Sequence, residues 1–277
     1  MKFVRKIKEA AGFANKPVSA DLYAAAGEER LSIPLIESLP DEELSRLNEL
    51  LPWASFVLDS GGRMFGAPYS RSKRSSAQPM PDYRAGILDS EFGLKGRAVL
   101  EAGCFEGNHT VGLAQSGALV TAFDGRVENV VKTQVRCSFF AIKANIVYWN
   151  AETQKPGYIA DRFDLLHHVG VLYHLSKPIA HLASLLPLIE TGVLLDTHVA
   201  DDMETQVDTF QGLEYRYANF REAGREPPFA GLTPSAQWIH SEDLLSTIRY
   251  FGFKNARIIE DRSEPNGKRV CIIASRN

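Results

Sequence analysis

The feature that most constrains the fold is a glycine-rich turn at Val99-Leu-Glu-Ala-Gly-Cys-Phe-Glu-Gly-Asn-His-Thr110, between an apolar run and a helix. The apolar run ends in the acid Glu101. Gly103 and Gly107 then permit a tight backbone, so that N–H groups at a helix N-terminus can approach a ligand closely. The next apolar run ends in Asp124, where a Rossmann-like sheet carries the carboxylate that binds ribose hydroxyls. This order of features predicts a nucleoside site at the ends of two neighbouring strands.

From about residue 95 the sequence alternates apolar strands with helices, which is typical of a parallel sheet covered on both faces. The predicted strands are 97–102, 119–124, 146–149, 163–169 and 192–198, and the predicted helices are 108 onward, 127–141 and 178–186. Ser241 is predicted to cap a further helix that ends near Phe251. Two final strands, 255–261 and 269–275, have no helix between them and should pair antiparallel. We therefore predict an α/β, Rossmann-like, seven-stranded, mostly parallel sheet with an antiparallel last hairpin.

The first 80 residues have a different pattern. Asp41 is placed to cap a helix that ends before Pro52, and residues 59–62 are suited to the turn of a hairpin. Residues 70–79 are polar and basic, which indicates a loop. We expect an N-terminal helical and hairpin cap at 1–80, which covers the site, and a nucleoside-binding domain at 81–277.

Composition narrows the class of protein. The chain has 277 residues, 44% of them hydrophobic and 23% charged, with a net charge of -3, so neither a disordered nor a fibrous chain is expected. Residues 1–16 resemble a short basic amphipathic helix laid on its own domain, and no run is long enough to span a membrane. The scattered Cys104, Cys137 and Cys271 indicate a reducing compartment. We expect a soluble, cytoplasmic protein without membrane contact.

The turn does not fit a dinucleotide, because the G-x-G-x-x-G fingerprint is absent and Glu106 would lie beside the pyrophosphate. By contrast, E-x-G-C-x-x-G with an acid one strand later resembles motif I and the ribose acid of class I S-adenosylmethionine-dependent methyltransferases, over about residues 95–277. The resemblance implies S-adenosylmethionine as cofactor and makes residues 81–277 the methyltransferase domain. The cofactor site that it implies comprises Glu101 and Gly103 near the methionine end, Cys104 and Gly107 in the same turn, Asp124 on the ribose, Asn150 and Ala151 beside the adenine, and His168 and Tyr173.

A second segment, Gly170-Val-Leu-Tyr-His174, is similar to one in the tRNA wobble-uridine carboxymethyltransferases and their methyltransferase relatives. Those enzymes use a carboxylated S-adenosylmethionine, whose extra carboxylate is held by an upstream lysine, the tyrosine of this segment and an arginine of the last hairpin. Tyr173 and Arg269 match the tyrosine and the arginine. The lysine is matched by Arg84 only in a shifted alignment, and Asp196 stands where those enzymes generally carry Glu. These departures favour ordinary methyl transfer.

Histidines at strand ends are the candidate catalytic groups. His174 and His198 lie just past the carboxyl ends of strands, where ligands of open α/β sheets bind. Histidine suits the removal of a hydroxyl proton near neutral pH. We predict His198 as the base, with Asp196 orienting its ring, and His174 as a further catalytic residue. For each histidine a structural hydrogen bond is the alternative.

Two other groups have open alternatives. His168, His174, His198 and Asp196 together resemble a metal site, but no short-spaced histidine pair supports one, and we predict no metal. Tyr215, Tyr217 and Arg269 are predicted to contact substrate. For the two tyrosines a packed insertion is the alternative.

The sequence therefore predicts an S-adenosylmethionine-dependent methyltransferase that O-methylates a small-molecule or sugar-like hydroxyl. One alternative is a tRNA wobble-uridine carboxymethyl or methyl transferase, in which Arg71, Lys73 and Arg74 would meet phosphate. Another is a catalytically silent S-adenosylmethionine-binding regulator. The oligomeric state and the identity of the acceptor are left open.

Overall fold

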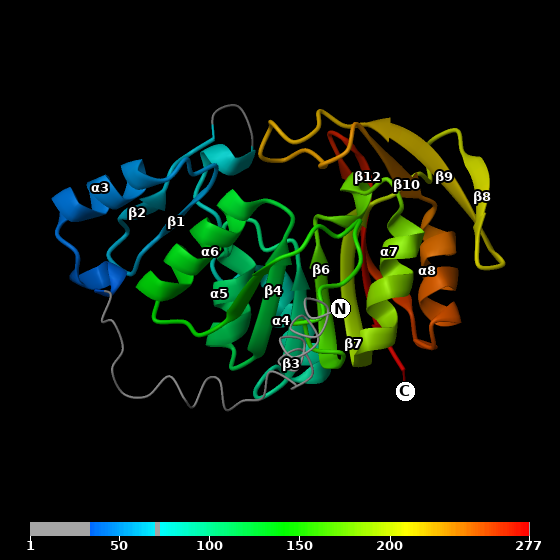
Figure 1. Ribbon diagram of the computed structural model, residues 1–277, viewed down its shortest axis with the longest axis horizontal. Helices are drawn as coiled ribbons and strands as arrows, with labels where there is room; N and C mark the ends of the chain where they lie inside the picture. The colour runs from blue at the N-terminus through cyan, green and yellow to red at the C-terminus, as the bar shows by residue number, and fades with distance from the viewer. Residues whose placement is uncertain (1–33, 70–72, 277) are drawn as a thin grey trace, which may run out of the picture.

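The computed structural model describes residues 34–69 and 73–276 (Figure 1). The predicted basic helix in residues 1–16 and Arg71 lie outside them. A central sheet lies between two layers of helices, with the cap at one end of the sheet and a small second sheet at the other. No helix within the described residues is long and apolar enough to cross a membrane.

The central sheet has seven strands in the order β11-β12-β7-β6-β3-β4-β5. Its strands are β3 (Ala98–Ala102), β4 (Leu119–Asp124), β5 (Asn145–Tyr148), β6 (Phe163–Val169), β7 (Ile189–His198), β11 (Arg257–Glu264) and β12 (Gly267–Ser275). All neighbours from β7 to β5 pair parallel, whereas β12 pairs antiparallel with both β7 and β11. The predicted sheet is therefore confirmed, including its antiparallel last hairpin.

Helices cover both faces of this sheet because its strands carry apolar side chains on both sides. On one face Leu100 and Leu166 pack with α7 (Pro178–Leu185) and α8 (Ser241–Tyr250). On the other face Val99 and Leu165 pack with α4 (Tyr83–Phe92) and α5 (Asn108–Gln115). α6 (Val127–Phe139) lies beside α5 and against β4 and β5. Short 3-10 helices occur at Ile36–Ser38, Lys73–Ser75, Leu172–His174 and Leu186–Leu188.

Two predicted helix caps are wrong, and one helix was missed. The N-cap residues are Pro40 and His240, so Asp41 and Ser241 are the first residues inside their helices. Ser241 instead donates its hydroxyl to Asp201 at 2.7 Å. Helix α4 was not predicted because its sequence is only weakly amphipathic. Asp82 caps it by accepting the N–H of Arg84.

The cap contains α3 (Asp41–Leu50) and an antiparallel hairpin of β1 (Phe56–Leu58) and β2 (Met64–Gly66), as predicted. Its core side chains, among them Trp53 and Phe65, pack against Phe139 and Phe140 at the end of α6. The cap thus buries its apolar face on the sheet domain. The boundary at residue 80 stays a prediction.

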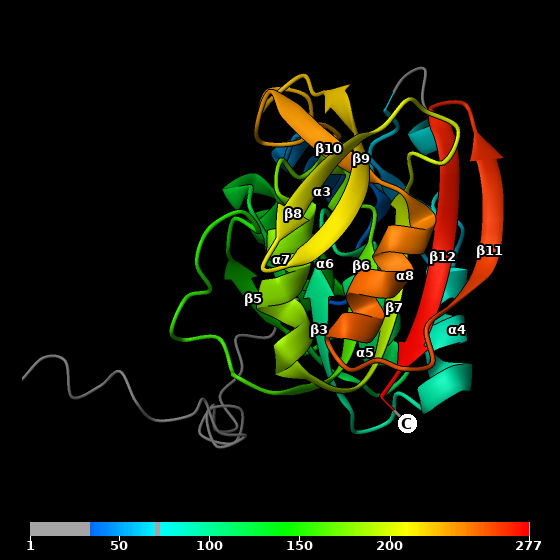
Figure 2. The ribbon, with the colours of Figure 1, turned by 90° about the vertical axis from the view of Figure 1, so that its right-hand side faces the viewer.

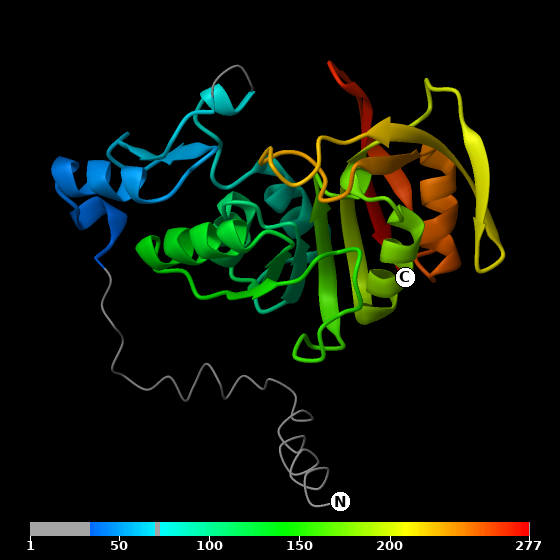
Figure 3. The ribbon, with the colours of Figure 1, turned by 45° about the horizontal axis from the view of Figure 1, so that its top comes forward.

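A second antiparallel sheet lies between β7 and α8 in sequence, with the order β10-β9-β8. Its strands are β8 (Gln206–Phe210), β9 (Leu213–Arg221) and β10 (Ser235–Ile239), and Figure 2 shows them beside α8. The loop between β9 and β10 reaches back toward the cap (Figure 3), where Phe229 lies 5.0 Å from Tyr69, ring centre to ring centre. This loop therefore crosses the edge of the central sheet at which the parallel strands end.

Candidate functional site

The glycine turn after β3 has the backbone that the sequence predicts. Gly103 has a φ of 70° and Gly107 a φ of 84°, and Gly107 is the N-cap of α5. A Cβ on Gly103 would lie 2.2 Å from Cγ2 of Val171, so no larger residue fits there without displacement. Only glycine adopts this conformation without strain, and it brings the turn close to the Gly170-Val-Leu-Tyr-His174 segment.

Asp124 ends β4 directly beside this turn. One carboxylate oxygen accepts the backbone N–H of Phe105 at 3.0 Å and the other accepts that of Arg126 at 2.8 Å. The side chain is largely buried, and burial raises the pKa of its carboxyl. The predicted ribose acid is therefore held in a fixed orientation next to the turn.

Glu101 is a buried acid with one oxygen that lacks a partner. The residue is 1% exposed, and within the described residues its Oε2 has no hydrogen-bond partner. Burial raises the pKa of this carboxyl to about 8. A buried carboxyl oxygen without a partner is costly, so the position suits an amine or another donor supplied by a ligand. Cys104 lies 3.4 Å from the hydroxyl of Thr133, and burial raises the pKa of its thiol well above its usual value, which argues against a nucleophile.

Three further predicted cofactor residues meet between the end of β5 and α7. Asn150 accepts the N–H of Glu152 at 3.0 Å, and the carbonyl of Ala151 lies 2.9 Å from Nδ1 of His181. His168 is fully buried, with its Nε2 3.0 Å from Nε2 of the same His181. Burial lowers the pKa of His168 well below its usual value, so its ring is neutral.

Asp196 lies among arginines. Its carboxylate is 0% exposed and pairs with Arg269, with Arg262 at 2.7 Å and with Arg84 at 3.4 Å. Burial opposes its ionisation, but the arginines outweigh burial and lower the pKa of Asp196. The guanidinium of Arg269 also lies over the ring of Tyr173, at 5.4 Å. The structure thus brings Tyr173 and Arg269 together, and the charge of Arg269 is already balanced by Asp196.

The arrangement around Asp196 bears on the metal alternative. Within the described residues, the one set of three possible ligand atoms that lie within 4.8 Å of one another comes from Asp196, Glu260 and Cys271 rather than from the histidines. Arg262 pairs with both of these carboxylates. The guanidinium of Arg262 therefore already supplies the positive charge that a metal ion would bring to these carboxylates.

A pocket of about 290 Å³ opens where the second sheet meets the strand ends of the central sheet. Its lining combines aromatic rings with polar groups from β7, β9, β10 and the 3-10 helix at Leu172–His174. Its lining includes Tyr173, His174, His198, Phe220, Glu222, Phe229 and Trp238. Three predicted site residues, Tyr173, His174 and His198, therefore share one pocket.

The two histidines of this pocket have different surroundings. The ring of His198 is stacked on Trp238 at 4.8 Å, meets the edge of Tyr173 at 4.7 Å, and has its Nδ1 3.2 Å from the carbonyl of Lys268. His174 instead has its Nδ1 2.8 Å from a carboxylate oxygen of Glu222. Asp196, predicted to orient His198, has its carboxylate among the arginines. Sequence analysis did not identify Glu222, which has no local signal beyond its place after a strand.

The predicted substrate tyrosines lie elsewhere on the second sheet. Tyr215 is 6% exposed and donates to Asp208 at 3.2 Å, and Tyr217 donates to Gln206 at 3.0 Å. The residues of β9 that line the pocket are Phe220 and Arg221. The role predicted for the two tyrosines stays a prediction.

The wall of the pocket is bound to the end of β4, next to the glycine turn. Arg126, two residues after Asp124, donates to the carbonyls of Arg225, Pro227 and Ala230 at 2.5, 3.1 and 2.7 Å. Phe229 from the same loop contacts Phe105 of the glycine turn, at 5.3 Å between ring centres. The pocket and the glycine turn are thus parts of one site.

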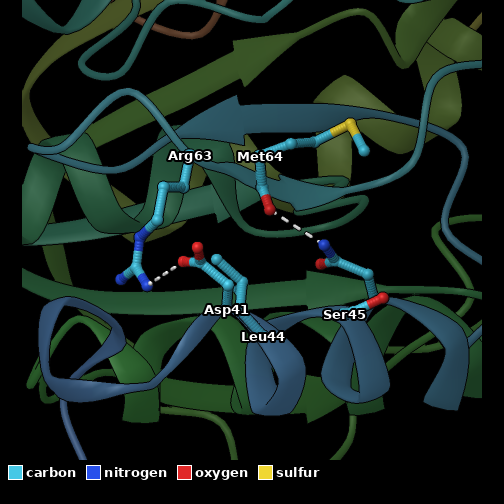
Figure 4. A pocket seen from close by; sticks show the side chains of 6 residues that line it. Asp41, Leu44, Ser45, Arg63 and Met64 are labelled. Carbon is cyan, nitrogen blue, oxygen red and sulfur yellow. Dashed lines mark hydrogen bonds and ion pairs between the residues drawn. The ribbon is translucent and has the colours of Figure 1, made fainter.

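A different depression of about 230 Å³ lies on the cap, between α3 and β2 (Figure 4). Asn48 donates to the carbonyl of Met64 at 2.8 Å across it, and Arg63 pairs with Asp41 at 3.1 Å. None of the predicted site residues lines it, and we assign it no role.

No protein-family model matches the chain. A tRNA U34 carboxymethyltransferase of Haemophilus ducreyi is 24% identical over an alignment of 278 positions, which covers 93% of this chain and 73% of that protein. One of Sulfurovum sp. is 33% identical over 118 residues, which cover 42% of this chain and 38% of that protein.

Among solved structures, the N-terminal domain of EvdMO1 with SAH bound superposes with a TM-score of 0.71 at 25% identity, covering 84% of this chain and 95% of that domain. The match to the structure of EvdMO1 itself covers 47% of that longer chain, with a TM-score of 0.61. The chain therefore shares its architecture with that domain over most of its length.

Proposed function

We propose that this chain, a class I S-adenosylmethionine-dependent methyltransferase by its fold and its relatives, methylates a hydroxyl of a small, sugar-like molecule bound in the pocket of His174 and His198. The observation that carries the proposal is that Arg126 binds the pocket wall to the end of β4, beside Asp124. An acceptor in this pocket would lie next to the cofactor. Proximity of that kind supplies much of the rate of a group transfer.

S-adenosylmethionine, when bound, supplies an electrophilic methyl group on a sulfonium. Gly103 would admit it to the turn, Asp124 would bind its ribose hydroxyls, and Glu101 would meet its methionine amine. The unpaired Oε2 of Glu101 supports this fit, since a donor from the ligand would give this buried oxygen a partner.

The pocket favours a small acceptor. Its volume of about 290 Å³ is at the low end of ligand pockets, which span about 300–1,000 Å³. The rings of Phe220 and Phe229 suit the apolar face of a sugar ring, and the polar groups suit its hydroxyls. The related EvdMO1 domain was crystallised in the presence of SAH and D-fucose, a sugar.

The arginine cluster favours the ordinary methyl donor. Arg269 and Arg84, the matches to the carboxylate-binding residues of the wobble-uridine enzymes, both pair with Asp196. A donor with an additional carboxylate would compete with Asp196 for them. tRNA carboxymethyl transfer remains the second candidate because several relatives carry that name and Tyr173 lies under Arg269.

We also propose that the protein is located in the cytoplasm, a reducing compartment. Cys104, Cys137 and Cys271 are all buried and free. Unpaired buried thiols are typical of proteins from reducing compartments.

Labelled-methyl transfer tests the function. The purified chain is incubated with S-adenosylmethionine or carboxylated S-adenosylmethionine, each labelled in the group to be transferred, and with D-fucose, a small-molecule extract or unmodified tRNA. We expect label in a small molecule. Label in tRNA alone, or transfer only from carboxylated S-adenosylmethionine, would replace the proposal by the second candidate. Cofactor binding by calorimetry without any transfer would indicate a silent regulator.

A further inference from the structure

We infer that Glu222 is a positioning residue that makes His174 the base for the acceptor hydroxyl. The inference rests on the proposed function and adds to it the atom that takes the proton. Its basis is the contact of 2.8 Å between Nδ1 of His174 and Oε1 of Glu222, inside the pocket that both residues line.

Both oxygens of Glu222 are engaged. The residue is 7% exposed, and its Oε2 accepts the N–H of Gly231 at 2.7 Å. A Cβ at Gly231 would lie 2.5 Å from the carbonyl oxygen of His174 and 3.1 Å from Cγ of Glu222. Glycine at this position is therefore what allows the loop to pack against His174 and hold the carboxylate in place.

The carboxylate decides the tautomer of the imidazole. An ionised carboxylate only accepts hydrogen bonds, so Nδ1 of His174 carries the proton and Nε2 keeps its lone pair. The side chain of His174 is 21% exposed and lines the pocket, so Nε2 is available to an acceptor. A carboxylate on the far nitrogen also stabilises the imidazolium that forms, as in other catalytic histidine pairs.

In the transfer, the acceptor oxygen forms the new C–O bond while the C–S bond of the donor breaks and its electron pair stays on sulfur. The hydroxyl proton goes to Nε2 of His174. Nδ1–H remains bonded to Glu222, and the proton on Nε2 is then released to solvent.

His198 is less suited to this role. It is 3% exposed, its ring lies between Trp238 and Tyr173, and its Nδ1 faces the Lys268 carbonyl. The titratable and charged groups around the His174 ring are Glu222, Tyr173 at 4.2 Å between ring centres, and His198 and Arg221 across the pocket. Of these, Glu222 lies within hydrogen-bond distance of the His174 ring, at Nδ1.

The test that needs no acceptor is NMR of the full chain labelled with 15N in its 7 histidines. A His174→Asn variant assigns the His174 signals. We expect wild-type His174 to carry its proton on Nδ1, and Glu222→Gln to populate both tautomers. Glu214→Gln, an exposed acid on β9, the strand that Glu222 follows, is the matched control and should leave the tautomer unchanged. An unchanged tautomer in Glu222→Gln would overturn the inference.

The second readout is labelled-methyl transfer to D-fucose and to a small-molecule extract. Glu222→Gln should lower kcat by at least about 10-fold, because a general base contributes about 10²- to 10⁴-fold and the variant disturbs its orientation, with little change in KM. Wild-type rates in this variant would contradict the role. Absence of transfer by the wild type would refute the proposed function while leaving the NMR result intact. Should Glu222→Gln fail to fold, Glu222→Asp keeps the charge but withdraws it from Nδ1, and it is expected to change the His174 tautomer and kcat in the same direction.

Discussion

Replacing Glu106 with glutamine should loosen the cap from the glycine turn. Glu106 is 0% exposed and accepts from three donors: the N–H of Ala54 at 2.8 Å, the hydroxyl of Ser55 at 2.7 Å and the ammonium of Lys132 at 2.9 Å. Two of these donors belong to the cap. Lys132 is itself 3% exposed, so the variant leaves its charge buried without a counterion.

The cost can be estimated from this geometry. Removing one partner of a buried ion pair costs about 3–5 kcal/mol. Glutamine keeps the shape and one acceptor, so we expect the low end, about 3 kcal/mol of the free energy of unfolding. For a chain of this size that corresponds to a fall in Tm of about 6–12 °C. A Glu106→Gln/Lys132→Met double variant should recover part of the loss, because it also removes the lone charge.

Chemical and thermal denaturation measure the effect, and limited proteolysis of the cap reports where it acts. The matched control is Glu42→Gln, which breaks a pair with Arg46 whose side chains are 76% and 65% exposed. Such a pair contributes less than about 1 kcal/mol. Equal midpoints for the Glu106 and Glu42 variants would refute the view that this buried pair anchors the cap.

Three further predictions concern the cofactor side of the site. Asp124→Asn should weaken S-adenosylmethionine binding about 10- to 100-fold, because hydrogen bonds to a charged group are worth about 1.5–3 kcal/mol, and unchanged affinity by calorimetry would contradict its role. Gly103→Ala should lower the free energy of unfolding by about 1–3 kcal/mol, because the new Cβ would lie 2.2 Å from Val171. The control is Gly86→Ala in α4, where a Cβ would meet nothing within 4 Å, and it should be neutral or stabilising in the same denaturation assay. Burial raises the pKa of Glu101 to about 8, so the folded chain keeps a proton that the unfolded chain loses above about pH 4.3. The free energy of unfolding should therefore fall as pH rises from about 5 to 8, by up to about 1.4 kcal/mol per pH unit. Glu101→Gln should remove that slope, and an unchanged slope in denaturant titrations at several pH values would exclude Glu101 as its source.

The parts of the fold that sequence analysis missed have weak or absent periodic patterns. Helix α4 is only slightly amphipathic, and four of the five residues of β8 are exposed. Neither segment therefore shows the periodic alternation of apolar and polar residues that indicates a helix or strand with one buried face. The inner strands β3, β4, β6 and β7 are largely buried on both faces and stand out as apolar runs. For that reason β4 and β6 coincide with their predicted ranges.

The residues predicted to bind the cofactor lie together in the structure because they are local to the chain. Gly103, Gly107 and Asp124 follow directly from a strand, a turn and the next strand end, so their order in the sequence determines their position in space.

The catalytic side of the site depends on contacts between distant segments. His174 and Glu222 come from different elements and meet only because β9 and its loop fold back over the sheet. Likewise, Asp196 was expected to orient His198, but β11, β12 and α4 surround it with arginines. The sequence by itself determined the sheet, its hairpin and the place of Asp124 beside the glycine turn, since these follow from short-range patterns of polarity and glycine. Only the tertiary structure decided which carboxylate meets which base, because that depends on how segments without mutual sequence signals pack together.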